Sequence, residues 1–422
     1  ITKLADAPDL EANKTVNMNE DVGVSLGLKA PVITDTGTGT TNNDYPERIG
    51  EITLTIGGAG ASGVTLASGA TTLTPVGGKV TIVLTDVDHV TSVPAANPAT
   101  GVYHLTTAQY EALVANPTPE SGANFTVTVS ATSYEVDGAG AIITGVAGAT
   151  STQAITVDVQ AVTDGATLAT SQTSLTFAED GAADLSGLLT AVRSDTEANG
   201  STDADGSERY SYTVSGLVTG TVVNINGTNY TANASGTVTS AETASFAGTP
   251  SIIITPPTNF SGDMNAITIT LNTRDTDGDS AGTPATLTSS VTLDLHVTPV
   301  AGDVSAANVT TLEDTAAAFL AGVAVTDTGS GATGSEVIDS VSFEVPTGWV
   351  LSAPTPSAGW TYDLTGTTAT ITFDNTLNES AREAILDGFT ITPPAHSSQD
   401  ATITLSITTT DSNSVNGSTV SD

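Results

Sequence analysis

The amino-acid sequence predicts an all-β protein made of three tandem sandwich units. Three observations support this: the composition, a pattern that recurs three times, and short segments in which apolar and polar residues alternate. Of the 422 residues, 38% are hydrophobic and only 4% aromatic, and there is no Cys. Strands of β-branched residues joined by Gly, Asp and Asn turns give such a composition. This length is enough for roughly two to four domains, each with its own core.

The repeating pattern consists of five landmarks in a fixed order. An acidic dipeptide opens each copy, in NEDVGVSL, AEDGAADL and LEDTAAAFL. A turn-rich stretch with an Asp, a Glu before an alternating segment, a Pro-rich turn, and a long alternating segment ending in Asp then follow. Such self-similarity indicates tandem copies of one module. The linkers between copies place the units at 1–164, 165–303 and 304–422.

Strands are predicted wherever apolar and polar residues alternate, as in 125–134, 267–272 and 402–408. About seven short strands per unit, separated by turn signals, are typical of an antiparallel sandwich. Only residues 412–422 follow the last long strand. The third unit is therefore expected to lack its final strand, and the chain is expected to be part of a longer protein.

Two short segments depart from this pattern and predict helices. Residues 106–116 and 378–388 each precede a Pro-rich turn. Thr106 with Gln109, and Ser380 with Glu383, fit the capping box of a helix N-terminus.

The charge balance excludes several partners. Nine basic residues face 46 acidic ones, for a net charge of −37, so nucleic acid and anionic membrane surfaces are poor partners. No apolar run is long enough for membrane insertion. Self-repulsion of this size favours bound cations. Without Cys, and with only four scattered His, zinc is disfavoured and Ca²⁺ is the expected cofactor. The alternative is an acidic surface that only keeps a secreted protein soluble.

Strand parity predicts where calcium binds. Successive loops of an up-and-down sandwich fall at opposite ends, so the acidic dipeptide lies at the bottom of its unit and the later acidic loops lie at the top. Carboxylates of two units and their linker should therefore meet at each joint, where Ca²⁺ takes roughly six to eight oxygen ligands. The predicted ligands are Glu20, Asp21, Asp164, Asp195, Asp203, Asp205, Glu208, Asp275 and Asp277 at the first joint; Glu179, Asp180, Asp303, Asp327, Glu336 and Asp411 at the second; and Asp6, Asp35, Glu47 and Asp137 at the top of unit one.

The strings DTDGDS and DADGSE match the start of an EF-hand loop but lack its bidentate Glu at position twelve. Taken alone they are equally well explained as ordinary turns.

A family resemblance rests on these motifs. The acidic opener, the D-x-D-G-S-E loop, the P-P-x-x-F-S-G turn and linkers resembling V-x-x-V-x-D-x-P make the chain similar to the cadherin-like and Ig-like repeats of large bacterial RTX adhesins exported by type I secretion. The resemblance implies Ig/cadherin-like sandwiches with calcium at the joints, held by a Glu of the preceding domain, a linker Asp and a D-x-D of the next. Two departures are the missing Pro after Asp164 and the single clear Asp at the last strand-end loop of unit three.

The resemblance also suggests why unit three is short. In some such adhesins a domain is split by an inserted ligand-binding domain. A chain that simply ends early is the alternative.

The expected function is a calcium-rigidified extracellular spacer on a bacterial surface, monomeric, which projects or supports a binding tip. Its expected partners are neighbouring adhesin domains and a glycan or peptide receptor. The alternative is that unit one, through its insertion 86–107, or unit three, through Trp349 and Trp360, binds a glycan or peptide itself. No catalytic motif such as G-x-S-x-G or H-E-x-x-H is present, so no enzyme is expected.

Overall fold

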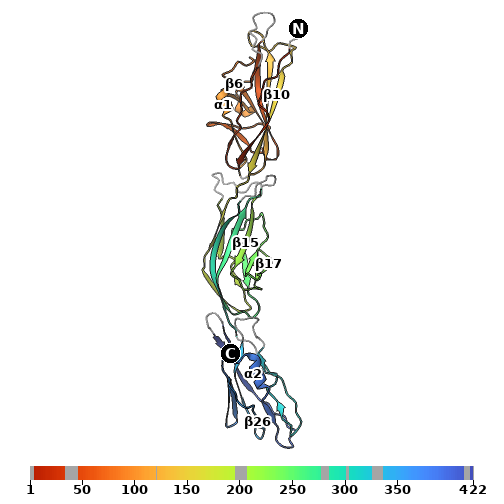
Figure 1. Ribbon diagram of the computed structural model, residues 1–422, viewed down its shortest axis with the longest axis vertical. Helices are drawn as coiled ribbons and strands as arrows, with labels where there is room; N and C mark the ends of the chain where they lie inside the picture. Colours follow the sequence, from red (N-terminus) through yellow and green to blue (C-terminus); the bar gives the residue numbers. More distant parts are fainter. Residues whose placement is uncertain are drawn as a thin grey trace.

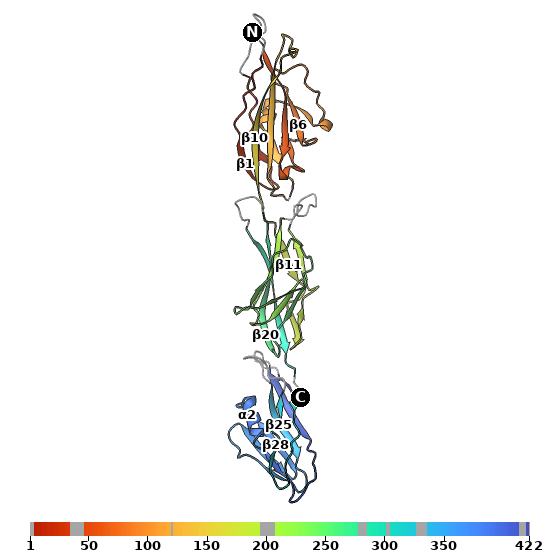
Figure 2. The same cartoon turned by 90° about the vertical axis from the view of Figure 1, so that its right-hand side faces the viewer.

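The computed structural model describes residues 4–33, 46–119, 121–194, 207–276, 285–300, 304–325, 336–412 and 419–421. Three β-rich bodies follow one another end to end and form a rod (Figures 1 and 2). Buried hydrophobic residues form three separate clusters, within 18–159, 166–297 and 320–389. The predicted all-β sandwich class is confirmed, because each cluster lies between sheets and the two α-helices are short.

Unit one has one large and one small sheet. The large sheet has the order β1 (Lys14–Asn19), β10 (Ala149–Gln160), β9 (Phe125–Glu135), β3 (Glu47–Gly57), β6 (Lys79–Leu84) and β7 (Val102–Leu105). The small sheet has the order β2 (Val24–Ser25), β8 (Val114–Asn116), β4 (Thr65–Ser68) and β5 (Thr71–Leu73). Helix α1 (Thr107–Glu111) and two 3₁₀ turns, Ala59–Ala61 and Pro98–Thr100, connect these strands.

Unit two repeats this plan. Its large sheet has the order β12 (Ser174–Ala178), β21 (Leu287–Thr298), β20 (Gly262–Arg274), β15 (Arg209–Ser215) and β18 (Thr237–Thr239). A second sheet contains β13 (Ala183–Asp184), β19 (Ile252–Thr255), β16 (Val222–Ile225) and β17 (Thr228–Thr231), and β11 (Ala166–Thr170) pairs with β14 (Leu189–Arg193).

Unit three has a large sheet in the order β27 (Trp360–Thr365), β28 (Thr368–Phe373), β25 (Val337–Glu344), β30 (Leu405–Ser412) and β31 (Thr419–Ser421). Strands β23 (Ala317–Ala318), β29 (Thr390–Thr392) and β26 (Val350–Ser352) form the opposite sheet, and β22 (Val304–Ser305) pairs with β24 (Ala324–Val325). Helix α2 (Glu379–Leu386) lies at the end nearest unit two (Figure 1).

In units one and two the last strand pairs in parallel with an early strand, which is β1, the first strand, in unit one and β12, the strand after β11, in unit two. Lys14 lies opposite Ile155 in the pairing of β1 with β10, and Ser174 lies opposite Asp294 in the pairing of β12 with β21. In these two units the last strand therefore sits between this early strand and the penultimate strand. This arrangement sends the chain out of each unit at the end opposite to its entry, as a rod requires.

The two helices test the capping predictions. Thr106 caps α1 as predicted: its Oγ1 accepts a hydrogen bond from the Gln109 N–H, and the Gln109 side chain accepts one from the Thr106 N–H. Helix α2 is capped by Asn378, whose side chain accepts from the Ala381 N–H at 3.0 Å. The prediction of Ser380 as the cap is therefore wrong. An Asn cap is at least as favourable, and it places Glu379 in the first turn, beside β25.

Candidate metal-binding joints

In units one and two, the Glu of the acidic dipeptide holds the linker that leaves its own unit. Glu20 follows β1; its N–H donates to the Gln160 carbonyl at 3.0 Å, and its Oε1 accepts from the Val162 N–H at 2.5 Å. Glu179 does the same in unit two, with the Thr298 carbonyl and the Val300 N–H. Glu20 is 4% exposed and Glu179 is 7% exposed. The parallel pairing of β1 with β10, and of β12 with β21, brings each Glu to its linker.

A Glu of the following unit holds the same linker from the other side. Glu208 stands just before β15, and its Oε1 accepts from the Asp164 N–H at 3.0 Å while its Oε2 accepts from the Tyr210 hydroxyl. At the top of unit one, Glu47 likewise accepts from the Asp6 N–H. The Asp275 N–H donates to Thr163 Oγ1 at 3.0 Å. The linker between units one and two is thus bound by both of its neighbours.

In each unit, the strand register places a second buried acid beside the Glu that precedes or begins the alternating strand, namely Glu47, Glu208 or Glu336. Glu47 lies directly opposite Glu135. In unit two, Arg209 pairs with Arg274, so Glu208 and Asp275 come together one residue further on. In unit three, Val337 pairs with Thr410, which brings Glu336 and Asp411 together in the same way. All six are between 2% and 8% exposed: Glu47 with Glu135, Glu208 with Asp275, and Glu336 with Asp411.

Sequence reasoning missed Glu135 and chose Asp137 in its place. The Asp137 Oδ1 accepts hydrogen bonds from the Ala139 and Ala141 N–H groups, both at 2.9 Å, and these bonds hold the pKa of Asp137 below its usual value. That carboxylate therefore organises a turn beyond the strand. Glu135 lies on the same inward-facing side of β9 as Phe125. This alternation could have identified it, but the repeat was aligned on an Asp at the strand end.

The first joint holds a pair of carboxyl groups that repel each other. Burial raises the pKa of Glu20 to about 9; the Val162 N–H lowers it, and the carboxylates of Asp275 and Asp21 raise it. Glu20 Oε2 and Asp275 Oδ1 are buried and receive no hydrogen bond from an N–H or O–H donor among the described residues. Two carboxylates can share such a site only through a proton or a cation.

The second acid of each dipeptide has a structural role. Asp21, Asp180 and Asp314 adopt left-handed backbone conformations, with φ of 62°, 56° and 62°. The Asp180 Oδ1 accepts from the Asn259 N–H at 2.9 Å, and the Asp314 Oδ1 accepts from the His396 N–H at 3.1 Å. In units two and three this Asp therefore fastens the Pro-rich turn of its own unit.

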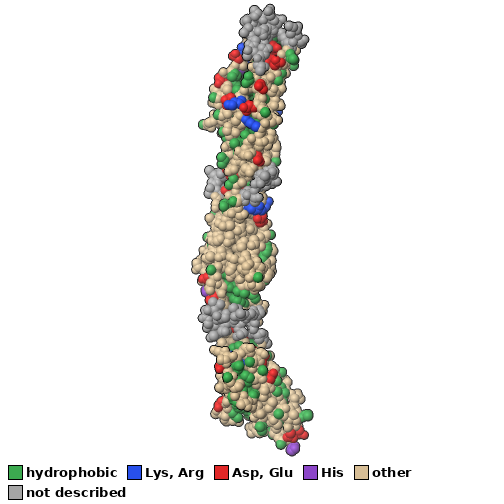
Figure 3. All heavy atoms as spheres, viewed as in Figure 1, with side chains coloured by type: hydrophobic (Ala, Val, Ile, Leu, Met, Phe, Trp, Pro, Cys, Tyr) green, Lys and Arg blue, Asp and Glu red, His purple; other side chains and the backbone are tan. Residues whose placement is uncertain are grey.

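Several predicted ligands lie outside the described residues: Asp35, Asp195, Asp203, Asp205, Asp277, Asp303 and Asp327. Among the residues that are described, no group of three or more His, Cys, Asp or Glu side chains could hold a metal by itself. A complete calcium site at either joint therefore needs acids from those ranges in addition to the buried pairs. On the face shown in Figure 3, the broad middle of unit two carries few charged side chains, and acidic ones lie toward its ends.

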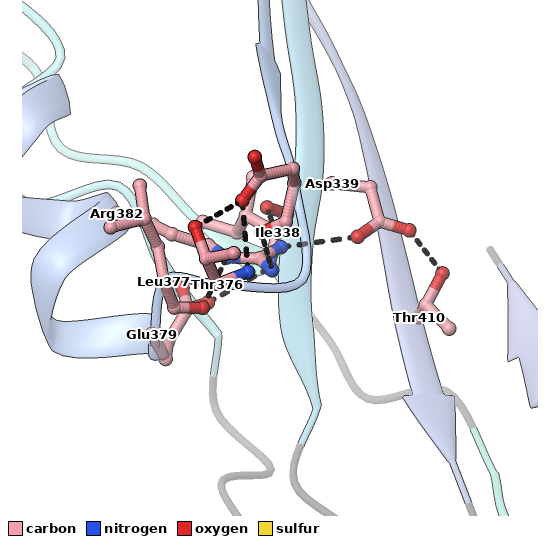
Figure 4. A network of polar contacts seen from close by, with 8 residues as sticks. Ile338, Asp339, Thr376, Leu377, Glu379, Arg382 and Thr410 are labelled. Carbon is pink, nitrogen blue, oxygen red and sulfur yellow. Dashed lines mark hydrogen bonds and ion pairs between the residues drawn. The ribbon is translucent and has the colours of Figure 1, made fainter. Parts of the chain in front are cut away.

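Unit three contains one further polar network near its upper end (Figure 4). Arg382 is 1% exposed, and its guanidinium donates to the carbonyls of Ile338 at 2.7 Å, Asp374 at 2.8 Å and Leu377 at 3.1 Å. It also forms an ion pair with Asp339 at 3.1 Å. Arg382 is the only Lys or Arg in 304–422. It binds α2 to the large sheet.

The features that suggested direct ligand binding are mostly structural. Trp360 is 5% exposed and stacks edge-on against Phe389 with ring centroids 5.8 Å apart, while Trp349 is half-buried. In unit one the insertion 86–107 supplies β7 to the large sheet, and Asp86 anchors it by accepting from the N–H and hydroxyl of Thr107.

The described part of the chain contains no helix long and apolar enough to cross a membrane. No protein-family model matches the sequence, and a search of curated proteins gives no match either. Among solved structures, the human desmocollin-1 ectodomain is 9% identical, over 99% of this chain and 78% of that one, with a TM-score of 0.23. A Ca²⁺-stabilised adhesin with which an Antarctic bacterium binds ice is 15% identical, over 98% and 73%, with a TM-score of 0.19. The adhesin InvE of Yersinia pseudotuberculosis is 17% identical, over 43% and 42%, with a TM-score of 0.17. At these TM-scores the likeness says nothing about function.

Proposed function

We propose that the chain is an extracellular spacer of a bacterial surface adhesin, stiffened by Ca²⁺ at its joints, which projects or supports a binding tip toward a glycan or peptide receptor. One observation carries the proposal: Glu20 of unit one and Glu208 of unit two both accept hydrogen bonds from the linker between them, and a further buried carboxylate, Asp275, lies beside Glu20. A flexible string of domains would not need to bury acids at its connections.

The donor set suits calcium. Carboxylate and carbonyl oxygens are the ligands that Ca²⁺ prefers, and their number and charge tune its affinity. Glu20, Asp164, Glu208 and Asp275 would hold the ion at the first joint, with the acids of 195–206 and 277–279 completing its shell. Glu179, Glu336 and Asp411, with Asp303 and Asp327, would do so at the second joint, and Asp6, Glu47 and Glu135 at the top of unit one.

When bound, the ion supplies the positive charge that the buried pairs lack. The hydrogen bonds to the linker N–H groups already fix the position of one oxygen of Glu20 and one of Glu208. Glu20 Oε2 and Asp275 Oδ1, which are buried and receive no such hydrogen bond among the described residues, would face the cation, so little ordering is needed on binding. The linker then cannot rotate without breaking contacts to both units.

A calcium titration followed by calorimetry and small-angle scattering tests the proposal. For extracellular modules with dissociation constants of about 0.1 to 1 mM, 10 mM Ca²⁺ should stabilise each occupied joint by about 1.4 to 2.7 kcal/mol. The melting temperature should rise and the maximum dimension should become sharply defined. In chelator the units should move independently, and Mg²⁺ should substitute poorly.

Unchanged dimensions and melting temperature on adding Ca²⁺ would refute the calcium-stiffened rod. Loss of the response in Asp275→Asn, with the response kept in Asp137→Asn, would place the ion at the joint, because the second residue lies in an exposed turn.

A further inference from the structure

The hairpin of β16 and β17 in unit two lies in a stretch of chain that carries almost no charge. Between Tyr210 and Gly262, Glu242 is the only Asp, Glu, Lys or Arg, although the whole chain contains 46 acidic and 9 basic residues. Strand β17 is the last strand of its sheet and lies along one side of unit two (Figure 1). Residues 226–229 and 231 are exposed. The hairpin is therefore a polar but uncharged surface on a strongly acidic rod.

Three N-x-S/T sequons follow one another across this hairpin and the turn after it. N-G-T begins at Asn226, N-Y-T at Asn229 and N-A-S at Asn233, and all three asparagines are exposed. A sequon is the acceptor for sugars that are linked to an asparagine amide, and the acceptor has to lie at the surface. Because the motif is short and recurs elsewhere in the chain, the conformation of each asparagine decides whether it can act as an acceptor.

The structure holds the first two amides by their oxygen atoms. The Asn226 Oδ1 accepts a hydrogen bond from the Ser251 N–H at 3.0 Å, and the Asn229 Oδ1 accepts one from the Asn224 Nδ2 at 2.6 Å. Asn224 is itself fixed across the turn, since its Oδ1 accepts from the Gly227 N–H at 3.0 Å. In both sequons the nitrogen, Nδ2, is at the opposite end of the amide from these contacts and makes no hydrogen bond with the described residues.

The third amide is held in the same way by more donors. The Asn233 Oδ1 accepts from the Ser235 N–H at 2.9 Å, from the Ser235 hydroxyl at 2.8 Å and from the Thr237 N–H at 3.2 Å. The hydroxyl of this sequon thus contacts the amide of its own asparagine. In the second sequon, Asn229 and Thr231 lie two residues apart on β17 and therefore share one face of the strand. In both cases the acceptor and its hydroxyl residue are presented together.

We propose that this surface is a glycosylation site, at which Asn226, Asn229 and Asn233 carry sugar on Nδ2. The donor is an activated sugar whose C1 is bonded to a phosphate oxygen of a nucleoside diphosphate or of a lipid carrier, and a glycosyltransferase catalyses the transfer. The Nδ2–C1 bond forms while the C1–O bond breaks. The phosphate leaves with the electron pair, and the amide gives up one proton to a base of the transferase. The amide oxygen takes no part, so the hydrogen bonds that hold it persist in the product.

Another sequon of the same chain provides an internal control. N-F-T begins at Asn124, which is half-buried, and its Oδ1 accepts from the Val159 N–H of β10 at 2.6 Å. The next residue, Phe125, is 1% exposed and belongs to the core of unit one. A transferase that acts on the folded chain should therefore leave Asn124 unmodified.

Peptide mapping of the chain isolated from the cells that make it tests the proposal. Cleavage after glutamate gives the peptide 209–242, which contains the three sequons of the hairpin and no other, and the peptide 121–135, which contains Asn124. We expect the mass of one or more sugars on 209–242, located on asparagine by fragmentation, and none on 121–135. A single sugar on each asparagine indicates a nucleoside diphosphate donor, and an oligosaccharide transferred as a block indicates a lipid-linked donor.

Two substitutions of one exposed residue separate the sequon from the fold. Thr231→Ala removes the hydroxyl of the second sequon and should abolish modification of Asn229 while Asn226 and Asn233 stay modified. Thr231→Ser keeps the hydroxyl and should keep the sugar on Asn229. The two variants, made without the transferase, should melt at the same temperature as the unaltered chain, because such surface substitutions change stability little. A native protein without sugar on 209–242, equal modification of 121–135, or sugar retained on Asn229 in Thr231→Ala would each overturn the proposal.

Discussion

Replacing Glu20 by Gln should have opposite effects with and without calcium. Without the ion, the folded protein at pH 8 must keep Glu20 protonated, because burial raises its pKa from 4.5 to about 9. The unfolded chain loses that proton. A pH of 8 lies 3.5 units above the ordinary pKa of 4.5 that applies in the unfolded chain. At about 1.36 kcal/mol per unit, this sets a ceiling of about 5 kcal/mol on the free-energy cost of keeping Glu20 protonated in the folded protein. Solvent and counter-ions at the joint reduce it, so we expect Glu20→Gln to raise the free energy of unfolding by about 1 to 3 kcal/mol in chelator.

The sign of this change in the free energy of unfolding follows from the linkage between proton binding and folding. A group whose pKa is raised on folding stabilises the protein below its unfolded pKa, and that stabilisation is lost as the pH rises toward the folded value. The advantage of Gln should therefore be near zero at pH 4 and should grow up to about pH 9. In 10 mM Ca²⁺ the substitution removes a charged ligand, and the calcium-dependent rise in melting temperature should shrink.

The assay is thermal unfolding of the full chain in chelator and in calcium, at pH 4, 6 and 8. Glu313→Gln is the matched control, because the same residue type at the same place in the repeat is exposed there. A Glu20→Gln protein that is destabilised equally in both conditions, or whose difference from wild type does not change with pH, would refute the reasoning.

Three other substitutions test the packing of single units. Arg382→Met should destabilise unit three by about 3 to 5 kcal/mol, measured by denaturant unfolding, because three backbone carbonyls and Asp339 lose their fully buried donor; Arg209→Met, at a half-buried site, is the comparison. Thr106→Ala removes the capping box of α1 and should cost unit one about 1 kcal/mol in the same measurement, whereas Ser380→Ala should cost little, since Asn378 is the cap of α2. Gly236→Ala should destabilise unit two by more than about 1 kcal/mol, seen as a lower melting temperature, because φ is +67° and a Cβ would lie 2.1 Å from the Leu217 carbonyl; Gly227→Ala, with φ of +90° but open space around it, separates backbone strain from the clash.

The sequence was most informative where a pattern recurs. The alternation along β9, β20 and β30 predicts both the strands and the side that faces the core, because the side-chain period of a strand is fixed by its geometry. The acidic dipeptide and the Glu before β15 were found because they occur in every unit. Parity then placed Glu20 and Glu208 at one joint, where the structure has them bound to the same linker.

Other features depend on contacts between distant segments and could not be predicted. The parallel pairing of β1 with β10 joins residues far apart in the sequence, and no local signal distinguishes it from an antiparallel arrangement. Glu135 was missed because the repeat was aligned on Asp, although only its register opposite Glu47 matters. Trp360 could equally have been a surface or a core residue until its contact with Phe389 was known.

The parallel pairing of the first and last strands of unit one has a mechanical consequence. When the two ends of a rod are pulled apart, tension enters unit one at the start of β1 and leaves it at the end of β10. These strands lie side by side over six residue pairs, from Lys14 with Ile155 to Asn19 with Gln160. Tension therefore loads this whole row of hydrogen bonds in shear, so they must break together and not one by one. Such a connection resists tension better than a hairpin that is peeled one bond at a time, and in unit two β12, which follows β11, has the same parallel pairing with β21.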